Sequence, residues 1–530
     1  MQNSGGHPKT PGLGHGGNLA AQALKAAGAD VVFTLSGGHL FPLYDGCVAA
    51  GIRLVDTRHE QTAGFAAEGW AKVTRRPGVA ALTAGPGITN GLGAMASALF
   101  GGSPMVVLGG RAPAARWGSG SLQELDHVPI VAEVAKRAVT AATTRDIFRE
   151  VARSLTEAAV APRGPCFVDF PLDQFFDRAP VPDEWSVTVD APGDPDPDTL
   201  ARVAKLLADA ERPVIMAGAG VYWDGAEAAL EELAEAAGAP VLMNGLGRGT
   251  LRASHLLAFS RARSVALRTA DLVVAAGVPL DSRLGFGARV VHLVEHPSMV
   301  ATHVELAGSA AGDLSAAFRG IVAAGVEASR PKERAGWLAD LSAEETALRE
   351  KEEQTLRSDN ELIHPARICG ELRDRLEPDG VVVVDGDDFG SYAGRLIDTE
   401  TPGAFLDPGS SGCLGAGPGY GLAARLAAVA GGRPDRQVFL MLGDGAAGFS
   451  LMDFDTLVRH EAPVVAIVAN GGPGTRYDEV VAALGGHGEL VTDPAEIGPA
   501  IDRALAAGVP ALVNVLTDPA DASPRSSAPL

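Results

Sequence analysis

The sequence has few aromatic residues and a marked shortage of basic ones. Aromatic side chains make up 5% of the 530 residues, and 44 lysines and arginines stand against 65 aspartates and glutamates, which gives a formal net charge of −21. An acidic surface of this kind argues against nucleic acid or an anionic membrane as a partner and favours solubility.

Cysteine is also scarce, and its four copies form no CxxC pair and no metal-ligand spacing. Neither a disulfide framework nor a structural zinc site is therefore expected. We interpret the cysteines as buried thiols in a reducing cytoplasm. They are Cys47, Cys166, Cys369 and Cys413.

No segment has the pattern of a signal peptide or a membrane span. Residues 1–17 lack an apolar core and are predicted to form a flexible tail. Residues 77–110 carry no charge, but glycines and prolines interrupt them repeatedly. They predict a buried strand, a glycine-rich turn, a helix and a second strand rather than one membrane helix.

Strand-like runs alternate with helical ones along most of the chain, which predicts an α/β protein with mostly parallel sheets. The length calls for several domains. A stretch rich in proline and aspartate at 178–198 and a charged helical linker at 331–360 divide the chain. We expect doubly wound domains at 18–180, 195–330 and 361–530.

The most specific motif lies between residues 438 and 472. A short apolar strand runs into Gly443-Asp444-Gly445, and a second one ends about two dozen residues later at Asn470. That spacing allows a helical crossover between parallel neighbours, so Asp444 and Asn470 are expected at adjacent carboxyl ends. Their oxygens, with a backbone carbonyl such as that of Gly472, suit Mg²⁺ bound to a phosphate.

A second motif begins at Glu60, which is predicted to open a helix rich in small residues. Alone, such a glutamate is adequately explained as a partner of the helix dipole. It is followed by the sequence TAGPGITN at residues 83–90. A carboxyl group in a largely apolar pocket could share a proton with a weak base.

Together these motifs resemble the thiamin diphosphate enzymes of the acetolactate synthase-like family, with similarity to 2-hydroxyacyl-CoA lyase and benzaldehyde lyase. The resemblance implies a pyrimidine-binding, a central Rossmann-like and a diphosphate-binding domain, with thiamin diphosphate and Mg²⁺ as cofactors. Glu60 would bind the aminopyrimidine ring and promote loss of the thiazolium proton. His39 and Gln123 would line the same pocket, although a backbone-bonded loop histidine explains His39 as well.

The third domain adds two glycine-bearing loops in the family's order, at residues 385–388 and 410–418. Glycines there would let backbone N–H groups approach phosphate oxygens at a helix start. The cofactor contacts implied by the resemblance, besides Glu60, are Pro86, Asn90, Gly386, Asp387, Gly412, Leu414, Gly443, Asp444, Gly445, Ala446 and Asn470.

The central domain leaves a nucleotide site open. Some family members hold FAD in this domain and others hold ADP, and glycine-rich strand ends are also ordinary in α/β proteins. The family commonly ends one strand in an aspartate that holds a ribose, where this sequence has Glu295. The candidate contacts are Arg263, Gly277, Arg283 and Glu295.

The sequence departs from the family directly after Asn470. Gly471 replaces the second asparagine of the metal motif, and a stretch of some twenty residues that usually covers the cofactor is missing. Two hypotheses follow. The chain is a working enzyme that condenses 2-oxo acids, or acts as a 2-hydroxyacyl-CoA lyase or oxalyl-CoA decarboxylase. Alternatively it is a catalytically impaired partner subunit. The resemblance also implies self-association into a homodimer or a dimer of dimers.

Overall fold

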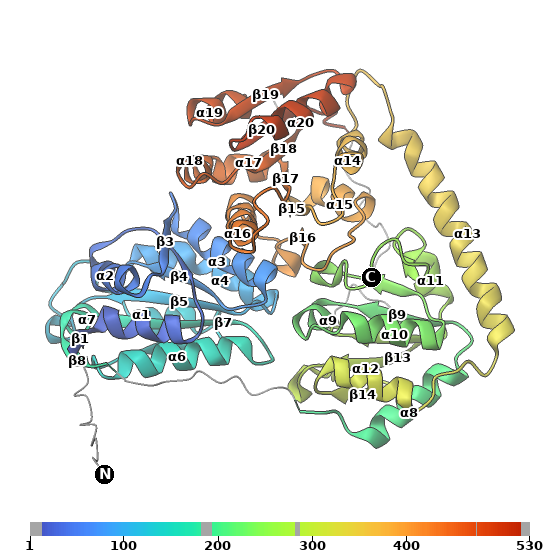
Figure 1. Ribbon diagram of the computed structural model, residues 1–530, viewed down its shortest axis with the longest axis horizontal. Coiled ribbons are helices and arrows are strands. Elements are labelled where there is room, and N and C mark those ends of the chain that lie inside the picture. The colour runs from blue at the N-terminus through green and yellow to red at the C-terminus, as the bar shows by residue number, and fades with distance from the viewer. Residues whose placement is uncertain (1–12, 182–192, 281–286, 473, 521–530) are drawn as a thin grey trace, which may run out of the picture. The chain divides into compact units, whose positions relative to one another are not determined.

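The computed structural model describes residues 13–181, 193–280, 287–472 and 474–520. Contacts divide the chain into two compact units. The first consists of residues 1–71, 76–99 and 103–190, and the second of residues 72–75, 100–102 and 191–530. The first unit contains one six-stranded sheet and the second contains two, and all three sheets are parallel throughout (Figure 1). The expected α/β class is confirmed.

The sheet of the first unit has the order β3-β2-β4-β5-β7-β6. The side chains of its central strands are mostly apolar and buried. Helices α3 and α4 lie on one face and α1 and α6 on the other (Figure 1). The strands are β2 (Val31–Thr34), β3 (Arg53–Asp56), β4 (Gly78–Leu82), β5 (Met105–Arg111), β6 (Arg137–Thr140) and β7 (Pro165–Pro171). The helices are α1 (Gly16–Ala26), α2 (Phe41–Ala50), α3 (Glu60–Thr74), α4 (Pro86–Phe100), α5 (His127–Val131), α6 (Asp146–Ala159) and α7 (Leu172–Phe176).

The expected tail at residues 1–17 is too long. Strand β1 (Leu13–His15) pairs antiparallel with β8 (Arg178–Pro180), and α1 begins at Gly16. His15 caps α1, because its Nδ1 accepts the N–H of Asn18 while the Asn18 side chain accepts the N–H of His15. This reciprocal cap fixes the start of the helix several residues before the predicted boundary.

The central domain has the sheet order β11-β10-β9-β12-β13-β14. Its strands are β9 (Pro213–Ala217), β10 (Val241–Met243), β11 (Ala258–Phe259), β12 (Leu272–Ala276), β13 (Arg289–Val294) and β14 (Gly308–Ala311). Its helices are α8 (Pro197–Asp209), α9 (Ala219–Trp223), α10 (Glu227–Ala237), α11 (Arg263–Thr269) and α12 (Leu314–Ala323).

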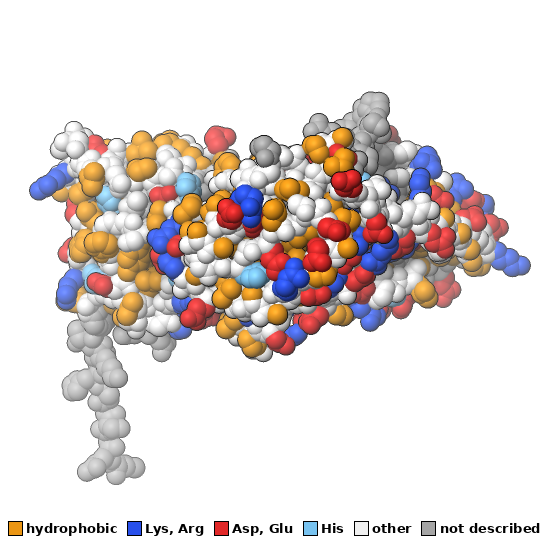
Figure 2. All heavy atoms as spheres, turned by 90° about the horizontal axis from the view of Figure 1, so that it is seen from above, with side chains coloured by type: hydrophobic (Ala, Val, Ile, Leu, Met, Phe, Trp, Pro, Cys, Tyr) orange, Lys and Arg blue, Asp and Glu red, His pale blue; other side chains and the backbone are white. Residues whose placement is uncertain are grey.

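The charged segment at 331–360 forms the long helix α13 (Pro331–Leu356), as expected from its sequence. It does more than link two domains, because Trp337 and Leu341 are buried one turn apart in a core cluster with Val214 and Val273 of the central sheet. Figure 2 shows mixed acidic and basic side chains at right, where Figure 1 places this helix.

The C-terminal domain has the sheet order β16-β15-β17-β18-β20-β19. Its strands are β15 (Val381–Asp385), β16 (Phe405–Leu406), β17 (Val438–Gly443), β18 (Val465–Asn470), β19 (His487–Val491) and β20 (Ala511–Leu516). Its helices are α14 (Pro365–Arg373), α15 (Asp387–Leu396), α16 (Gly417–Ala430), α17 (Asp444–Ser450), α18 (Phe454–Arg459), α19 (Tyr477–Ala483) and α20 (Ile497–Ala506).

No helix within the described ranges is long and apolar enough to cross a membrane. Cys47, Cys166 and Cys369 are buried, and burial raises the pKa of each thiol to about 12. Cys413 is only half-buried, so the interpretation of all four cysteines as buried thiols was wrong for this one.

Candidate active site

Glu60 stands at the first position of α3, and three residues separate it from the carboxyl end of β3 at Asp56. Its side chain is buried, and its Oε2 accepts a hydrogen bond of 3.0 Å from Nδ2 of Asn90 on α4. Two residues named from separate motifs are thus brought together. The bond holds the carboxyl group at the helix start, where the partial positive charge of the dipole faces it.

The loop between β4 and α4, residues 83–85, contacts two further candidates, His39 and Gln123. His39 is buried and its Nδ1 lies 3.3 Å from Oγ1 of Thr83. Burial lowers the pKa of His39 below its ordinary value, so the ring is neutral near pH 7.

Gln123 lies beside the same loop. A Cβ added to Gly85 would come within 3.0 Å of the Gln123 Cβ. Both residues have positive φ, 61° for Gly85 and 56° for Gln123. For a side chain such as Gln this conformation costs free energy and is found preferentially at functional sites. Pro86, the next predicted contact, is exposed at the start of α4.

Sequence reasoning missed the polar pair beneath this loop. His127 and Asp169 are both fully buried, and His127 Nδ1 lies 2.9 Å from Asp169 Oδ2. The other ring nitrogen, Nε2, accepts the backbone N–H of Gly85 at 2.9 Å. A lone histidine in the local sequence QELDHVPI carries no signal for either partner, since each lies 42 residues away along the chain.

In the C-terminal domain, Asp444 follows β17 and Asn470 is the last residue of β18, and the two strands are parallel neighbours, as the sequence predicted. A Cβ added to Gly472 would lie 2.8 Å from Asp444 Oδ2 and 3.7 Å from Asn470 Oδ1. The backbone of Gly472 therefore passes both oxygens, and a side chain at this position would fill the space between them.

This set of donors fits Mg²⁺. Nδ2 of Asn470 is fixed by bonds to the Thr475 carbonyl and to Asn514 Oδ1, each 3.0 Å long. Its Oδ1 is buried and accepts no hydrogen bond from any described residue. A buried acceptor without a donor is costly unless something else binds it. A divalent cation shared with the Asp444 carboxylate would satisfy it.

The glycine loops converge on the same end of this sheet. Gly386 has φ 110° and packs against Gly443, and a Cβ on it would lie 3.2 Å from the Gly443 nitrogen and 3.6 Å from the Ala446 Cβ. Asp385, buried at the end of β15, accepts the backbone N–H groups of Gly415 and Gly417 at 3.0 and 2.7 Å. It thereby ties the 410–418 loop to the strand.

Burial raises the pKa of Asp385 to about 6 despite the N–H groups of Gly417 and Gly415, which oppose the shift. Desolvation of the carboxylate outweighs these hydrogen bonds. Arg283 and the side chain of Asp387 lie outside the described residues.

The central-domain candidates do not form one group. Gly277 and Glu295 lie together, because a Cβ added to Gly220 would be 2.6 Å from the Gly277 Cα and 2.4 Å from Glu295 Oε2. Arg263 instead lines a cavity of about 960 Å³ that also contains Gly386, Gly412 and Leu414 of the C-terminal domain. The other arginines of this cavity are Arg248, Arg261, Arg268 and Arg395.

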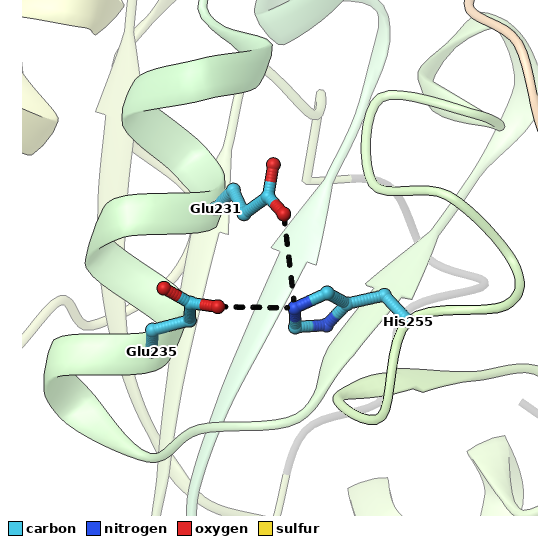
Figure 3. Close-up of side chains that lie close together, drawn as sticks. All are labelled: Glu231, Glu235 and His255. Atoms are coloured by element: carbon cyan, nitrogen blue, oxygen red, sulfur yellow. Dashed lines mark hydrogen bonds and ion pairs between the residues drawn. The ribbon is translucent and has the colours of Figure 1, made fainter.

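A surface group in the central domain has the composition of a metal site. Glu231 and Glu235, one turn apart on α10, face Nε2 of His255 (Figure 3). However, His255 Nδ1 accepts the N–H of Leu257 at 3.1 Å, which places the ring proton on Nε2. The proton occupies the position a metal would need, so the group is better explained as a histidine that donates to carboxylates.

The geometry defines a three-domain α/β protein with a buried carboxyl group at one sheet end and, at another, carboxylate and amide oxygens beside glycine-rich loops. Three family descriptions match it in order along the chain. They are the N-terminal TPP binding domain (14–130), the central domain (200–321) and the C-terminal TPP binding domain (388–474) of thiamine pyrophosphate enzymes.

Two mycobacterial proteins are 52% identical to the chain over alignments that cover 97% of each partner. They are the acetolactate synthase large subunit of Mycobacterium tuberculosis and the probable acetolactate synthase of Mycobacterium bovis. The 2-hydroxyacyl-CoA lyase 2 of Bos taurus is 32% identical over 89% of this chain and 81% of its own. The chain therefore belongs to the thiamine pyrophosphate enzymes and is closely related to the acetolactate synthase large subunit.

Proposed function

We propose that the protein is a Mg²⁺-dependent carboligase that condenses 2-oxo acids, as expected of an acetolactate synthase. The observation that carries the proposal is the buried Glu60 carboxyl group, held by Asn90 at the start of α3. The 52% identity to the mycobacterial acetolactate synthase large subunit supports the choice of reaction.

Each candidate residue has a defined task in this reaction. When bound, thiamin diphosphate supplies a carbon nucleophile for a carbonyl substrate. Glu60 shares a proton with the aminopyrimidine, and Asn90 orients its carboxyl group. His39, neutral because of its burial, and Gln123 lie against the loop at 83–85. Asp444, Asn470 and the Gly472 carbonyl would hold Mg²⁺, which supplies positive charge for the diphosphate.

The purified protein, supplied with thiamin diphosphate, Mg²⁺ and pyruvate, tests this reading. We expect pyruvate consumption with formation of acetolactate. A control with a 2-hydroxyacyl-CoA as the sole substrate should release little aldehyde. Cleavage of the carbon–carbon bond next to the thioester carbonyl, with release of an aldehyde and without acetolactate formation, would replace the proposal by the lyase alternative.

The arginine-lined cavity favours a second ligand with several phosphates. Burial lowers the pKa of Arg263 to about 10, and the neighbouring Arg248 adds to the shift. Adjacent buried guanidinium groups are stabilised by an anion. We propose that the cavity holds the phosphates of a nucleotide such as FAD or ADP, or of a CoA substrate. Acid denaturation of the purified protein followed by chromatography would release a bound nucleotide.

The missing stretch after Asn470 supports the alternative of an impaired subunit. The alignment with the mycobacterial relatives spans 549 positions and is longer than this chain, so these relatives carry residues that it lacks. A cofactor-dependent rate no higher than that of free thiamin diphosphate would favour this alternative.

Self-association into dimers is proposed from the family resemblance. Burial of the exposed Phe41, Trp117 and Leu122 of the first unit would favour such an interface. Sedimentation of the purified protein tests it.

A further inference from the structure

The pair His127–Asp169 is the most deeply buried polar contact of the first unit's site. Both side chains are fully shielded from solvent, and Asp169 Oδ2 also accepts Nη1 of Arg111 at 3.0 Å. The other terminal nitrogen of Arg111, Nη2, donates to Oδ1 of the exposed Asp126 at 3.0 Å. The carboxylate is therefore balanced by a guanidinium group, and the histidine does not need to be charged to compensate it.

The hydrogen bonds define the tautomer of His127. A backbone N–H can only donate, so the Nε2 that receives the Gly85 N–H must present its lone pair. The single ring proton then resides on Nδ1 and is donated to Asp169. The ring is neutral, and both of its nitrogens are occupied. His127 therefore has no free position from which to exchange a proton with a substrate.

Gly85 is the residue on which the other candidates of this unit depend. Its carbonyl accepts the N–H groups of Ile88 and Thr89 at the start of α4, the helix that carries Asn90 to Glu60. Thr83, two residues before Gly85, contacts His39. Gly85 itself packs closely against Gln123. A shift of the Gly85 backbone would move all of these contacts together.

We propose that His127 is a positioning residue for the thiamin-dependent reaction, which fixes the Gly85 N–H through its Nε2 and thereby sets the start of α4 and the Asn90–Glu60 pair. Asp169 orients the ring in this role, as a carboxylate orients a metal-binding or catalytic histidine elsewhere. The inference deepens the proposed function and rests on it for its catalytic consequence.

Two substitutions of His127 distinguish its contact with the Gly85 N–H from its contact with Asp169. In His127→Asn the shorter amide can still donate to Asp169 but cannot reach Gly85, whereas in His127→Gln the amide oxygen can occupy the place of Nε2. We expect His127→Asn to lower kcat about 10- to 100-fold with little change in the KM for pyruvate. His127→Gln should restore most of this loss.

Hydrogen exchange followed by mass spectrometry on the cofactor-free protein gives a readout that does not depend on activity. The peptide spanning residues 83–95 should exchange about 10-fold faster in His127→Asn than in the wild type or His127→Gln. His292 offers a matched control, because it is equally buried, accepts the N–H of Ala301 at Nδ1 and faces the Val278 carbonyl at Nε2. His292→Asn should leave the exchange of residues 83–95 unchanged.

The outcomes are distinguishable. The inference is overturned if His127→Asn and His127→Gln have the same kcat as each other and the same rate of exchange at residues 83–95. This holds even if both variants lose thermal stability. Absence of thiamin-dependent turnover in the wild type would overturn the proposed function, while the exchange comparison would still decide the role of His127. If His127→Asn does not fold, the wild type decides, because rapid exchange of the Gly85 amide would contradict the proposal.

Discussion

The first unit and the C-terminal domain use the same device, a parallel sheet whose strand ends carry the functional residues, but complete it differently. In the first unit the candidate side chains bond to one another, Glu60 to Asn90 and His127 to Asp169 and Gly85. In the C-terminal domain Asn470 Oδ1 is left without a donor among the described residues. The first site is preorganised by its own contacts, whereas the second has a buried acceptor to which, as we propose, a cation binds.

Because of this difference, we expect substitutions in the two regions to change different measured quantities. Changes in the first unit should reduce the rate of the chemical step while cofactor binding persists, because its side chains already hold their geometry. Changes at the C-terminal sheet end should reduce binding of the metal and diphosphate. Three substitutions and one labelling experiment test this division, and we give them in decreasing order of expected effect.

Replacement of Glu60 by Gln should have the largest effect on rate. The amide keeps the size and can still accept from Asn90, but it cannot share a proton, so kcat should fall about 10²- to 10⁴-fold. Pyruvate consumption at saturating cofactor measures it. Glu133→Gln, the same change at an exposed position of the same unit, serves as control. Retention of full activity in Glu60→Gln would remove the first unit from the chemistry.

Replacement of Asp444 by Asn should abolish the Mg²⁺-dependent rise in melting temperature that cofactor binding produces. The loss of a carboxylate ligand weakens a hard cation site strongly. Differential scanning calorimetry with and without a chelator detects this effect. Asp455→Asn, which removes the negative charge that pairs with Arg459 on α18, should behave like the wild type. Equal stabilisation in both variants would show that Asp444 is no ligand.

Asp385→Asn should make stability less dependent on pH. The native pKa of about 6 exceeds the ordinary value of 3.8, so the native state binds the proton more tightly. Its stabilising contribution is present below about pH 4 and is lost as pH rises through 6. Asn cannot ionise, so the variant does not lose this contribution. Its free energy of unfolding should therefore be about 3 kcal/mol higher than that of the wild type at pH 8 and equal to it at pH 4. Urea titrations at both pH values measure it, and lower stability of the variant at pH 8 would contradict the assignment.

The smallest effect concerns thiol reactivity. Cys413, half-buried between Gly412 and Leu414, should react with iodoacetamide in the native protein, while the three buried thiols with pKa near 12 should not. Bound cofactor should slow this reaction if the loop contacts the diphosphate. Peptide mapping after alkylation identifies the modified residue, and unchanged labelling in the presence of Mg²⁺ and cofactor would argue against contact by this loop.

Local sequence patterns were sufficient to predict much of this architecture. The apolar runs before Gly443 and up to Asn470 predicted two adjacent parallel strands, and the pairing of β17 with β18 confirms it. The small-residue pattern after Glu60 predicted a helix that begins there, and α3 does. These features depend on short-range periodicity and turn residues, which a single sequence displays directly.

Contacts between distant segments were not predictable in the same way. The importance of His127 depends on Asp169 and Gly85, and neither partner is marked by spacing or composition. The boundary at residue 18 was wrong because the reciprocal cap of His15 and Asn18 and the pairing of β1 with β8 stabilise residues 13–17. The roles of the site residues themselves stay predictions.

Calorimetric titration of the protein with thiamin diphosphate, with and without Mg²⁺, separates the roles of Glu60 and Asp444. We expect saturable binding that requires Mg²⁺, persists in Glu60→Gln and is lost in Asp444→Asn. Absence of binding at millimolar cofactor, or binding that is equally strong without the metal, would contradict it.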